Sequence, residues 1–361
     1  MYDLDTLNKF DLIIDARSPR EFADDHLPGA INLPVVFDDE YAEVGTTHRT
    51  DPMRAYQIGV AYSLRNIARH LELPFFRTSR RASILVYCAR GGKRSKLWTD
   101  ALETIGYKVQ RLPTGWKGYR TWVRQTLDEI PTQLQLNVLS GPTGCGKTRL
   151  LLALREAGAQ VLDLEALASH RGSIIGAIPG RAQPSQKLFD SLLLAEISLL
   201  DLSKQVWIES ESKRIGRVQL PTALFDRMHG GRLYAVDTPM PERVAMWHRE
   251  YPHFERDPVG LVAQLGYLRA LVGGVTLQKW ASLAERREID ALFESIMVDY
   301  YDPAYVRSTK KNYSHTGHAI PIELKTLDSA DLANVAGCLI SDSGAVPPLS
   351  LEYDVCPPVH R

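Results

Sequence analysis

Short apolar runs alternate with longer stretches of helical periodicity along most of the chain. The runs 11–17, 82–86, 107–112, 134–140, 159–165, 205–211 and 233–237 are rich in apolar residues, which favours strands buried in a sheet. Apolar positions recur at helical spacing over 58–71, and helices are expected from 241 to 296. Strands that alternate with helices predict an α/β protein with parallel sheets and a helical C-terminal part.

A cysteine directly follows one of these predicted strands. Cys88 lies at the carboxyl end of the run 82–86, and that edge of an open α/β sheet is where ligands bind. The next residues combine glycines, bases and a hydroxyl: Arg90, Gly91, Gly92, Lys93, Arg94 and Ser95. The glycines allow a tight turn whose N–H groups converge on the sulfur, at the expected start of a helix. This environment favours the thiolate, so it predicts a nucleophilic cysteine beside an oxyanion site.

The alternative for Cys88 is a small buried thiol without chemistry. Three basic residues and two glycines within six positions are not explained by that alternative. Cys88 and Arg94 are therefore the candidate catalytic residues, and the intervening loop is the candidate donor site.

A second glycine-rich loop joins the predicted strand 134–140 to the helical run 149–154. Its sequence, Gly141-Pro142-Thr143-Gly144-Cys145-Gly146-Lys147-Thr148, is a complete phosphate-binding loop in the required context. Loop N–H groups cradle a phosphate chain, Lys147 neutralises it and Thr148 can bind magnesium. The predicted phosphate-binding residues are Gly141, Gly144, Cys145, Gly146, Lys147 and Thr148, with Cys145 contributing its backbone.

Two acidic residues at the ends of predicted strands are candidates for holding that magnesium through water. They are Asp163 and Glu209, and a solvated strand end explains either of them equally well. The sequence identifies no certain metal ligand.

Composition limits the partners and the compartment. With 43 basic and 43 acidic residues the formal net charge is zero, so a nucleic acid must bind to a local basic surface. The four cysteines are scattered, which suggests neither a disulfide framework nor a zinc site. There is no run of eighteen apolar residues and no signal pattern at the N-terminus, so we expect a cytoplasmic protein without a membrane partner.

The first third of the chain resembles the rhodanese-like family. The runs 15–22 and 26–32 match its N-terminal signature, 88–95 its active loop and 113–119 a late segment. Many rhodanese sulfurtransferases have four residues between cysteine and arginine, whereas five separate Cys88 from Arg94. That spacing resembles the loop of cysteine-dependent phosphatases. It makes a wider cradle, able to hold a tetrahedral donor that carries phosphate.

The order of the two loops, with the runs 164–173, 183–186 and 207–212, resembles bacterial tRNA 2-selenouridine synthases over residues 10–305. The resemblance implies a rhodanese-like domain in 1–130 and a P-loop NTPase-like α/β domain in 131–310. The role of 311–361 is open.

The same resemblance implies a two-step reaction on the wobble 2-thiouridine of tRNA. Geranyl diphosphate alkylates the sulfur, and selenium from selenophosphate then displaces the thiol. Cys88 would carry the selenium as a perselenide, with Arg94 on the phosphate, and the P-loop would bind geranyl diphosphate with magnesium. An enzyme that supplies selenophosphate is a possible partner.

Three other functions stay open on the sequence alone. The chain could be a cysteine-dependent phosphatase or a persulfide-forming sulfurtransferase joined to a nucleotide-binding domain, or a binding module with an inactive P-loop. The basic segments 77–81 and 213–214 are candidate tRNA contacts or solvated charges, and the tyrosines in 299–313 are candidate base-stacking residues or a packed helix end. Neither the oligomeric state nor the choice between geranyl diphosphate and a nucleotide follows from the sequence.

Overall fold

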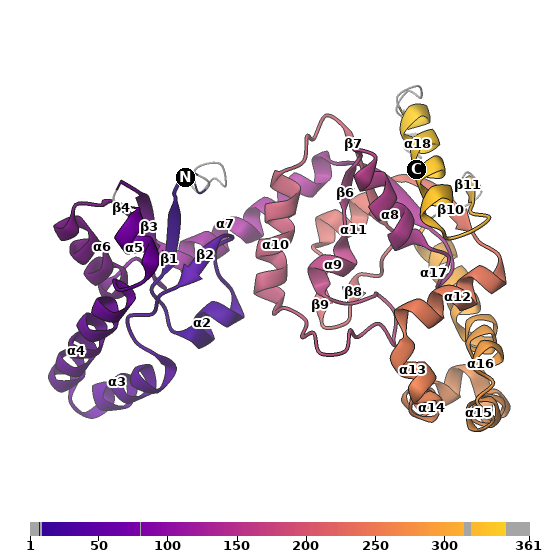
Figure 1. Cartoon of the computed structure of the whole chain (residues 1–361), viewed down its shortest axis with the longest axis horizontal. Coiled ribbons are helices and arrows are strands. Elements are labelled where there is room, and N and C mark those ends of the chain that lie inside the picture. Colours follow the sequence, from indigo (N-terminus) through magenta and orange to yellow (C-terminus); the bar gives the residue numbers. More distant parts are fainter. Residues whose placement is uncertain (1–6, 8, 80, 314–318, 344–361) are drawn as a thin grey trace, which may run out of the picture. The chain divides into compact units, whose positions relative to one another are not determined.

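The computed structural model describes residues 7, 9–79, 81–313 and 319–343. These residues form two compact units (Figure 1). Of the described residues, the first unit comprises those in 7–138, 162–232 and 312–313, and the second those in 139–161, 233–311 and 319–343. Parallel sheets with flanking helices confirm the predicted α/β class.

The first sheet has four parallel strands in the order β2-β1-β3-β4. They are β1 (Leu12–Asp15), β2 (Ala30–Asn32), β3 (Ser83–Tyr87) and β4 (Lys108–Arg111). The helices that accompany it are α2 (Pro19–Asp24), α3 (Asp38–Thr50), α4 (Pro52–His70), α5 (Pro74–Thr78), α6 (Lys93–Ile105) and α7 (Gly115–Glu129). The predicted strands 11–17, 82–86 and 107–112 are thus confirmed as β1, β3 and β4, with ends shifted by a few residues.

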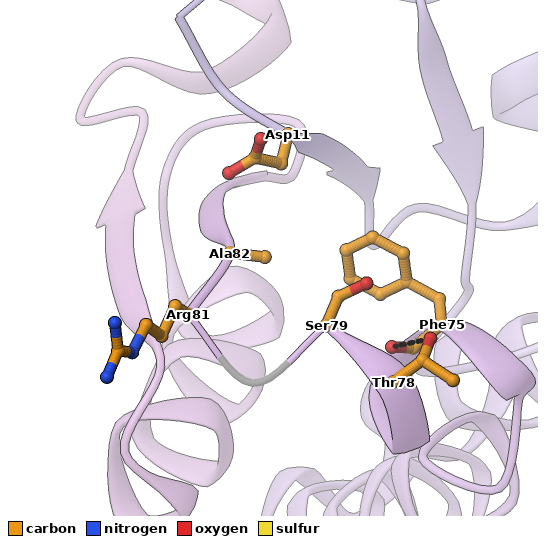
Figure 2. Close-up of a pocket in the computed structure, with 6 residues that line it drawn as sticks. All are labelled: Asp11, Phe75, Thr78, Ser79, Arg81 and Ala82. Atoms are coloured by element: carbon orange, nitrogen blue, oxygen red, sulfur yellow. Dashed lines mark hydrogen bonds between the residues drawn. The ribbon is translucent and has the colours of Figure 1, made fainter.

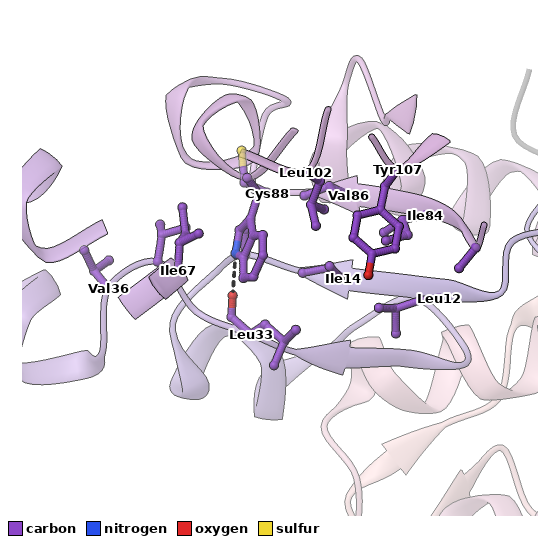
Figure 3. Close-up of a cluster of buried hydrophobic side chains, with 14 residues drawn as sticks. Leu12, Ile14, Leu33, Val36, Ile67, Ile84, Val86, Cys88, Leu102 and Tyr107 are labelled. Carbon is purple, nitrogen blue, oxygen red and sulfur yellow. Dashed lines mark hydrogen bonds between the residues drawn. The ribbon is translucent and has the colours of Figure 1, made fainter. Parts of the chain in front are cut away.

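The core of this sheet forms because the central strands are apolar on both faces. Ile14, Ile84 and Val86 are fully buried and pack with Trp98 of α6 (Figure 3). The Trp98 indole N–H donates to the Leu33 carbonyl at 2.9 Å, which satisfies its one polar atom inside the core. Cys88 belongs to the same cluster, so a packed core fixes the base of the candidate loop.

Further elements complete the first unit. They are η1 (Ile130–Gln133), α9 (Leu164–Ala168), α10 (Gln186–Ser198), β7 (Gln205–Glu209), β8 (Arg214–Ile215), β9 (Val218–Gln219) and α11 (Thr222–His229). Helix α10 packs against α7. At that contact the buried Arg120 of α7 donates to Asp190 at 2.8 Å and to Ser191 at 3.1 Å, and lies 3.4 Å from Asp25. This network ties the first sheet to α10.

The second unit contains the helix that follows the P-loop and most of the C-terminal helices. Its elements are α8 (Lys147–Glu156), β10 (Arg232–Asp237), α12 (Met240–Glu250), α13 (Pro252–Arg256), α14 (Pro258–Leu265), η2 (Gly266–Leu268), α15 (Arg269–Glu285), α16 (Ile289–Ile296), the π-helix η3 (Met297–Tyr301), α17 (Asp302–Asn312), β11 (Ile320–Glu323) and α18 (Ser329–Ser343). With β5 (Gln135–Ser140), β6 (Gln160–Leu162) and β7, strands β10 and β11 form a sheet in the order β11-β10-β5-β7-β6.

The described part of the C-terminal segment is integrated into the second unit. Strand β11 pairs in parallel with β10, and helix α18 packs on α8 directly after the P-loop. The Leu327 side chain between them approaches the P-loop glycine Gly146. Residues 319–343 therefore have a structural role beside the phosphate-binding loop, a role that the sequence left open.

One apolar helical stretch, Pro258–Glu285, is long enough to cross a membrane by length and composition. The 3-10 turn η2 interrupts it, and Gly273 has a non-helical φ of 84° within α15. One such stretch is weak evidence for a membrane span.

The tyrosines near the end of the helical region are packed. Tyr300 and Tyr301 are buried, and the Tyr305 hydroxyl hydrogen-bonds to Ser140 at the end of β5. Packing at a helix end, the default alternative for these residues, is therefore confirmed over base stacking.

Candidate active-site loops

The Cys88 loop begins where β3 ends and is held from both sides. Cys88 is 3% exposed, and its Sγ lies 3.3 Å from the Ser95 Oγ in the first turn of α6. The backbone N–H of Trp116 donates to the Cys88 carbonyl at 2.9 Å, which anchors the loop to α7. Gly91 has a φ of +65°, and a Cβ there would lie 1.9 Å from the Pro113 carbonyl oxygen. Only glycine fits that position, as the sequence predicted for a tight turn.

Electrostatics around Cys88 favour the thiolate. Burial raises the pKa of the Cys88 thiol, but hydrogen bonds from Ser95 and the backbone of Arg90, with the charge of Arg94, outweigh it. The net effect lowers the pKa of Cys88 below its ordinary value. The loop amides and Arg94 are groups that the loop sequence indicated, whereas the Ser95 hydroxyl contributes most to the lowering and the charges of Arg90 and Lys93 are not among the causes.

Arg94 is paired with a carboxylate that sequence analysis did not single out. Its Nη1 lies 2.5 Å from the Glu21 Oε2, and its Nη2 donates to Oε1 at 3.2 Å. Glu21 also closes the capping box with Ser18 at the start of α2. Burial raises the pKa of Glu21, but its contact with Arg94 outweighs this and lowers the pKa. The capping-box pattern was visible in the sequence, but its link to Arg94 was not.

Aromatic rings from α3 and α4 line the rim of the Cys88 loop. The Lys93 ammonium lies 3.8 Å from the ring centroid of Tyr56, and the Arg94 guanidinium 5.5 Å from that of Tyr41. Both rings are about half exposed. Arg90 and Gly92 are exposed as well. The rim thus combines the exposed cations of Arg90 and Lys93 with two half-exposed aromatic rings.

Three glycines shape the P-loop. Gly141, Gly144 and Gly146 have φ values of +158°, +82° and +84°. A Cβ on Gly141 would lie 2.6 Å from the Val236 carbonyl oxygen, and one on Gly144 would lie 3.2 Å from the Trp247 indole. The loop backbone therefore lies so close to neighbouring residues that these glycine positions leave no room for a side chain.

The other P-loop residues also occupy their predicted places. Lys147 and Thr148 begin α8, and the Lys147 Nζ donates to the Gly141 carbonyl at 2.9 Å and to the Pro142 carbonyl at 3.3 Å. Cys145 is buried, and its carbonyl accepts from the Thr238 hydroxyl at 2.9 Å. Its N–H donates to the Pro142 carbonyl at 3.3 Å, and its role toward a phosphate stays a prediction.

A buried arginine outside the motif holds the P-loop backbone. Arg243 of α12 donates from Nε and Nη2 to the Thr143 carbonyl at 3.1 and 2.8 Å. The same guanidinium donates to both carboxylate oxygens of Asp302 at 3.0 and 2.6 Å. Asp302 directly follows the π-helix, a local irregularity that often occurs at functional sites. Nothing in the sequence pattern indicated Arg243, because its partners lie a hundred residues away on one side and about sixty on the other.

The two magnesium candidates differ in their environment. The Asp163 carboxylate accepts from the Ala166 N–H and caps α9. The Glu209 carboxylate, at the end of β7, has an oxygen within 4.8 Å of one from Glu165 and one from Glu211. This group of three carboxylates could hold a divalent cation. It includes Glu209 and not Asp163.

One basic segment flanks a pocket at the opposite end of the first sheet from Cys88. The pocket is lined by Asp11, Phe75, Thr78, Ser79, Arg81 and Ala82 (Figure 2). Asp11 precedes β1 and Ala82 precedes β3, so the pocket lies at the amino ends of these parallel strands. Arg77 and Arg81 are exposed there, whereas Arg80 lies outside the described residues.

The second basic segment, 213–214, is partly engaged in hydrogen bonds. Lys213 donates to Thr222, and Arg214 donates to the Gly216 carbonyl.

Together these features define a class of protein. The first sheet carries an activated cysteine in a loop at its carboxyl edge, and the second carries a P-loop. A family model for the rhodanese-like domain matches residues 3–121, and a model for the tRNA 2-selenouridine synthase AAA domain matches residues 134–259. The chain therefore combines a rhodanese-like domain with a P-loop-type domain, as the sequence predicted.

Whole-chain relatives identify the family. A tRNA 2-selenouridine synthase from Nitrosomonas europaea is 34% identical over 83% of this chain and 76% of that protein. One from Sulfurovum sp. is 31% identical over 86% and 93%. The N-terminal domain of an ATP/GTP-binding protein from Clostridium difficile 630 is 32% identical over 33% of this chain and 95% of that structure, with a TM-score of 0.30. The chain belongs to the tRNA 2-selenouridine synthase family.

Proposed function

We propose that this protein converts the wobble 2-thiouridine of tRNA to 2-selenouridine in two steps, first prenylation of the sulfur and then exchange for selenium. The observation that carries the proposal is the presence of two separate anion-binding loops, one with an activated thiol and one without, in a member of this family. Each loop suits one of the two phosphate-bearing reagents, selenophosphate and geranyl diphosphate.

The P-loop serves the prenylation step. The thiocarbonyl sulfur attacks the first carbon of geranyl diphosphate, the carbon–oxygen bond breaks and diphosphate leaves. Lys147 and the loop N–H groups stabilise the charge that develops on the departing diphosphate. Diphosphate is the part of this reagent that a P-loop recognises, so the loop is compatible with geranyl diphosphate without nucleotide hydrolysis.

The Cys88 loop serves the selenium step. S-alkylation converts the thiocarbonyl into an isothiourea-like carbon with a better leaving group. Cys88 is the nucleophile that acts on selenophosphate, and Arg94 with the loop N–H groups binds the phosphate. The selenium then adds at the same carbon, and the prenyl thiolate departs.

Magnesium fits one group of residues in this scheme. Carboxylate oxygens suit this cation, and Glu209 with Glu165 and Glu211 supplies three of them. A cation held by these carboxylates would supply positive charge. At the P-loop, the Thr148 hydroxyl would be a ligand for a magnesium ion bound with the diphosphate. Asp163 fits less well because it caps α9.

The tRNA partner is best accommodated at the rim of the Cys88 loop. Lys93 and Arg94 with the exposed rings of Tyr56 and Tyr41 provide charge for phosphate and faces for bases. We place the reaction in the cytoplasm, with an enzyme that makes selenophosphate as a possible partner.

Nucleoside mass spectrometry tests the proposal. Purified protein is incubated with 2-thiouridine tRNA, geranyl diphosphate and selenophosphate, and the thiolated, prenylated and selenated nucleosides are measured. We expect the prenylated form without selenophosphate and the selenated form with both reagents. Lys147→Ala should abolish prenylation. If that variant still prenylates and loses only selenation, the assignment of geranyl diphosphate to the P-loop is wrong.

A further inference from the structure

We propose that Asp25 is a positioning residue for Cys88, which it reaches through the side chain and the backbone of Trp116. Asp25 directly follows α2, and Trp116 lies in the first turn of α7. Trp116 belongs to the late rhodanese segment 113–119, for which the two-step reaction has no role. The inference rests on the proposed function in one respect, the use of Cys88 as the nucleophile.

The first turn of α7 lies directly against the Cys88 loop. The Trp116 N–H donates to the Cys88 carbonyl at 2.9 Å. The next N–H along the chain, that of Lys117, donates to the Ala89 carbonyl at 2.9 Å. A Cβ on Gly115 would lie 2.2 Å from the Cys88 carbonyl oxygen, so the two backbones are in contact. The orientation of the Cys88 backbone, and with it the place of the sulfur, therefore depends on this turn of α7.

A buried carboxylate fixes the side chain of Trp116. The indole N–H of Trp116 donates to the Asp25 Oδ2 at 2.7 Å, and Asp25 is 0% exposed. The Arg17 guanidinium lies 4.9 Å from the centroid of the Trp116 ring, and its Nη2 donates to the Asp25 backbone carbonyl at 2.5 Å. Trp116 is thus held at its indole N–H, at its ring face and at the backbone N–H that bonds to Cys88. A residue fixed at three points leaves the loop carbonyl one place to bind.

Helix α10 holds Asp25 from the other side. The Ser191 Oγ donates to the Asp25 Oδ1 at 2.8 Å, and the Arg120 Nε lies 3.4 Å from Oδ2. Both oxygens of the carboxylate are therefore engaged away from solvent. Ser191 lies outside the rhodanese-like match, in the region that the tRNA 2-selenouridine synthase AAA model covers. A helix from that region thus completes the surroundings of a residue that positions the rhodanese-like loop.

The hydrogen bond from Trp116, and not the charge of Asp25, carries the positioning. Burial raises the pKa of Asp25, and the contacts with Arg120, Ser191 and Trp116 offset this only in part. The site therefore disfavours a full charge while it supplies donors for both oxygens. Asparagine has the same shape without the charge. Its oxygen can accept from the Trp116 indole, and its NH2 group can donate to the Ser191 hydroxyl.

Alkylation of Cys88 tests the proposal without tRNA, geranyl diphosphate or a selenium donor. Full-length protein is treated with iodoacetamide at a series of pH values, and modification of the Cys88 peptide is timed by mass spectrometry. Trp116→Phe removes the indole N–H but keeps a ring beside Arg17. We expect the rate at pH 7 to fall about three- to tenfold and the acid limb to move to higher pH, because a displaced sulfur loses hydrogen bonding from Ser95. Trp122→Phe, the same change further along α7, should stay within about twofold of wild type.

Variants of Asp25 separate positioning from stability. Asp25→Ala should slow alkylation as much as Trp116→Phe does, and the double variant should be no slower than either single variant, because both changes break the same contact. Asp25→Asn should react like wild type. Asp24→Asn is the control, since it removes an exposed charge that pairs with Lys187 of α10 at 2.7 Å, and it should leave the rate unchanged. Thermal unfolding of every variant is measured alongside, and Trp116→Phe decides the test if Asp25→Ala does not fold.

Three results would overturn the inference. They are a wild-type rate and pH profile in Trp116→Phe, losses that add in the double variant, and a slow Asp25→Asn variant with wild-type stability. None of these measurements involves tRNA or a phosphate-bearing reagent. Failure of the nucleoside conversion would therefore leave them unchanged, so the two proposals fail separately.

Discussion

The Cys88 loop and the P-loop are two versions of one structural device, a glycine-rich turn between a parallel strand and a helix that binds an anion. They differ in how the basic side chain of each loop is held in place. Arg94 is fixed by Glu21, a carboxylate from a helix outside the loop. Lys147 donates to carbonyls of its own loop, so a bound diphosphate competes with Gly141 and Pro142 for it.

This difference indicates a division of labour. A nucleophile needs a rigid target, and an external carboxylate keeps the Arg94 guanidinium in one orientation beside Cys88. In the proposed scheme the P-loop binds and releases a diphosphate, so Lys147 has to follow the charge of that group and needs no fixed orientation. The P-loop is instead supported from behind, where Arg243 donates to the Thr143 carbonyl.

The largest expected effect is the loss of the reaction that depends on the P-loop, while the reaction that depends on the Cys88 loop continues. Lys147→Ala should lower the rate of prenylation by about a hundredfold or more, because the charge of the departing diphosphate is no longer neutralised. The same variant should keep the selenation of tRNA that already carries the S-geranyl group within about twofold of wild type, since that step uses the other loop. Lys204→Ala, at an exposed lysine, is the control for loss of a positive charge. A parallel loss of both activities would show that the loops do not act independently.

The glycines of the Cys88 loop allow a matched pair of variants. Gly91→Ala places a Cβ 1.9 Å from the Pro113 carbonyl oxygen at a φ of +65°, so the loop must deform. We expect roughly 1–3 kcal/mol of lost stability and loss of most Cys88-dependent activity. Gly92→Ala has no atom within 4 Å of the new Cβ and should be close to wild type. Thermal unfolding and the selenation of S-geranylated tRNA measure the pair, and equal behaviour of the two variants would contradict the described loop geometry.

Loss of the Arg243 contacts to the P-loop should affect the binding of geranyl diphosphate more than the rate of its reaction. Arg243→Lys cannot donate to the Thr143 carbonyl and both oxygens of Asp302 in the same geometry. We expect the KM for geranyl diphosphate to rise about tenfold, with a smaller change in kcat, because the loop N–H groups are less well ordered. Arg249→Lys, at an exposed site on the same helix, should change neither constant. A fall in kcat alone would argue against a positioning role.

The pH dependence reports on the activation of Cys88. The thiolate of Cys88 is the form that reacts in the proposed selenium step, so the rate of selenation should fall as the pH drops through the pKa of Cys88. Ser95→Ala removes a hydrogen bond that lowers this pKa, while burial, which raises it, remains. The acid limb of the pH–rate profile should therefore move to higher pH, with a modest loss of rate at neutral pH. An unchanged limb would mean that another group titrates.

The smallest effect concerns the rim of the Cys88 loop. Tyr56→Ala removes the ring beneath Lys93 and should cost about 0.5–1 kcal/mol of stability at this exposed site. Tyr56→Phe keeps the ring face and should cost less. In the conversion of tRNA, Tyr56→Ala should raise KM while the phenylalanine variant stays near wild type. Equal KM values for all three proteins would remove Tyr56 from the tRNA surface.

Much of the site was predictable because each loop is contiguous in sequence. The spacing of Gly91, Gly92 and Arg94 after a predicted strand was enough to predict the tight turn after Cys88 and the position of Arg94 in the first turn of α6. The glycines before Lys147 were equally informative. Short apolar runs predicted the strands, since a parallel strand buried on both faces needs only local hydrophobicity.

The residues that sequence analysis missed all act across long separations. Glu21 is 73 residues from Arg94, and Arg243 is 100 residues from Thr143. The role of 319–343 beside α8 was also missed, because β11 has only a short apolar signal of its own. No local pattern encodes such contacts, which arise when the chain folds back on itself.

The sequence by itself determined how the two loops are composed, a thiol among loop amides and a lysine after a glycine-rich turn, because those groups are neighbours along the chain. Only the tertiary structure decided how each cation is held, by Glu21 for Arg94 and by loop carbonyls for Lys147, and which carboxylates gather around Glu209. The physical reason is the distance along the chain that separates the interacting residues. Backbone turns are set by adjacent residues, whereas charge pairing in a folded protein depends on which distant segments are packed together.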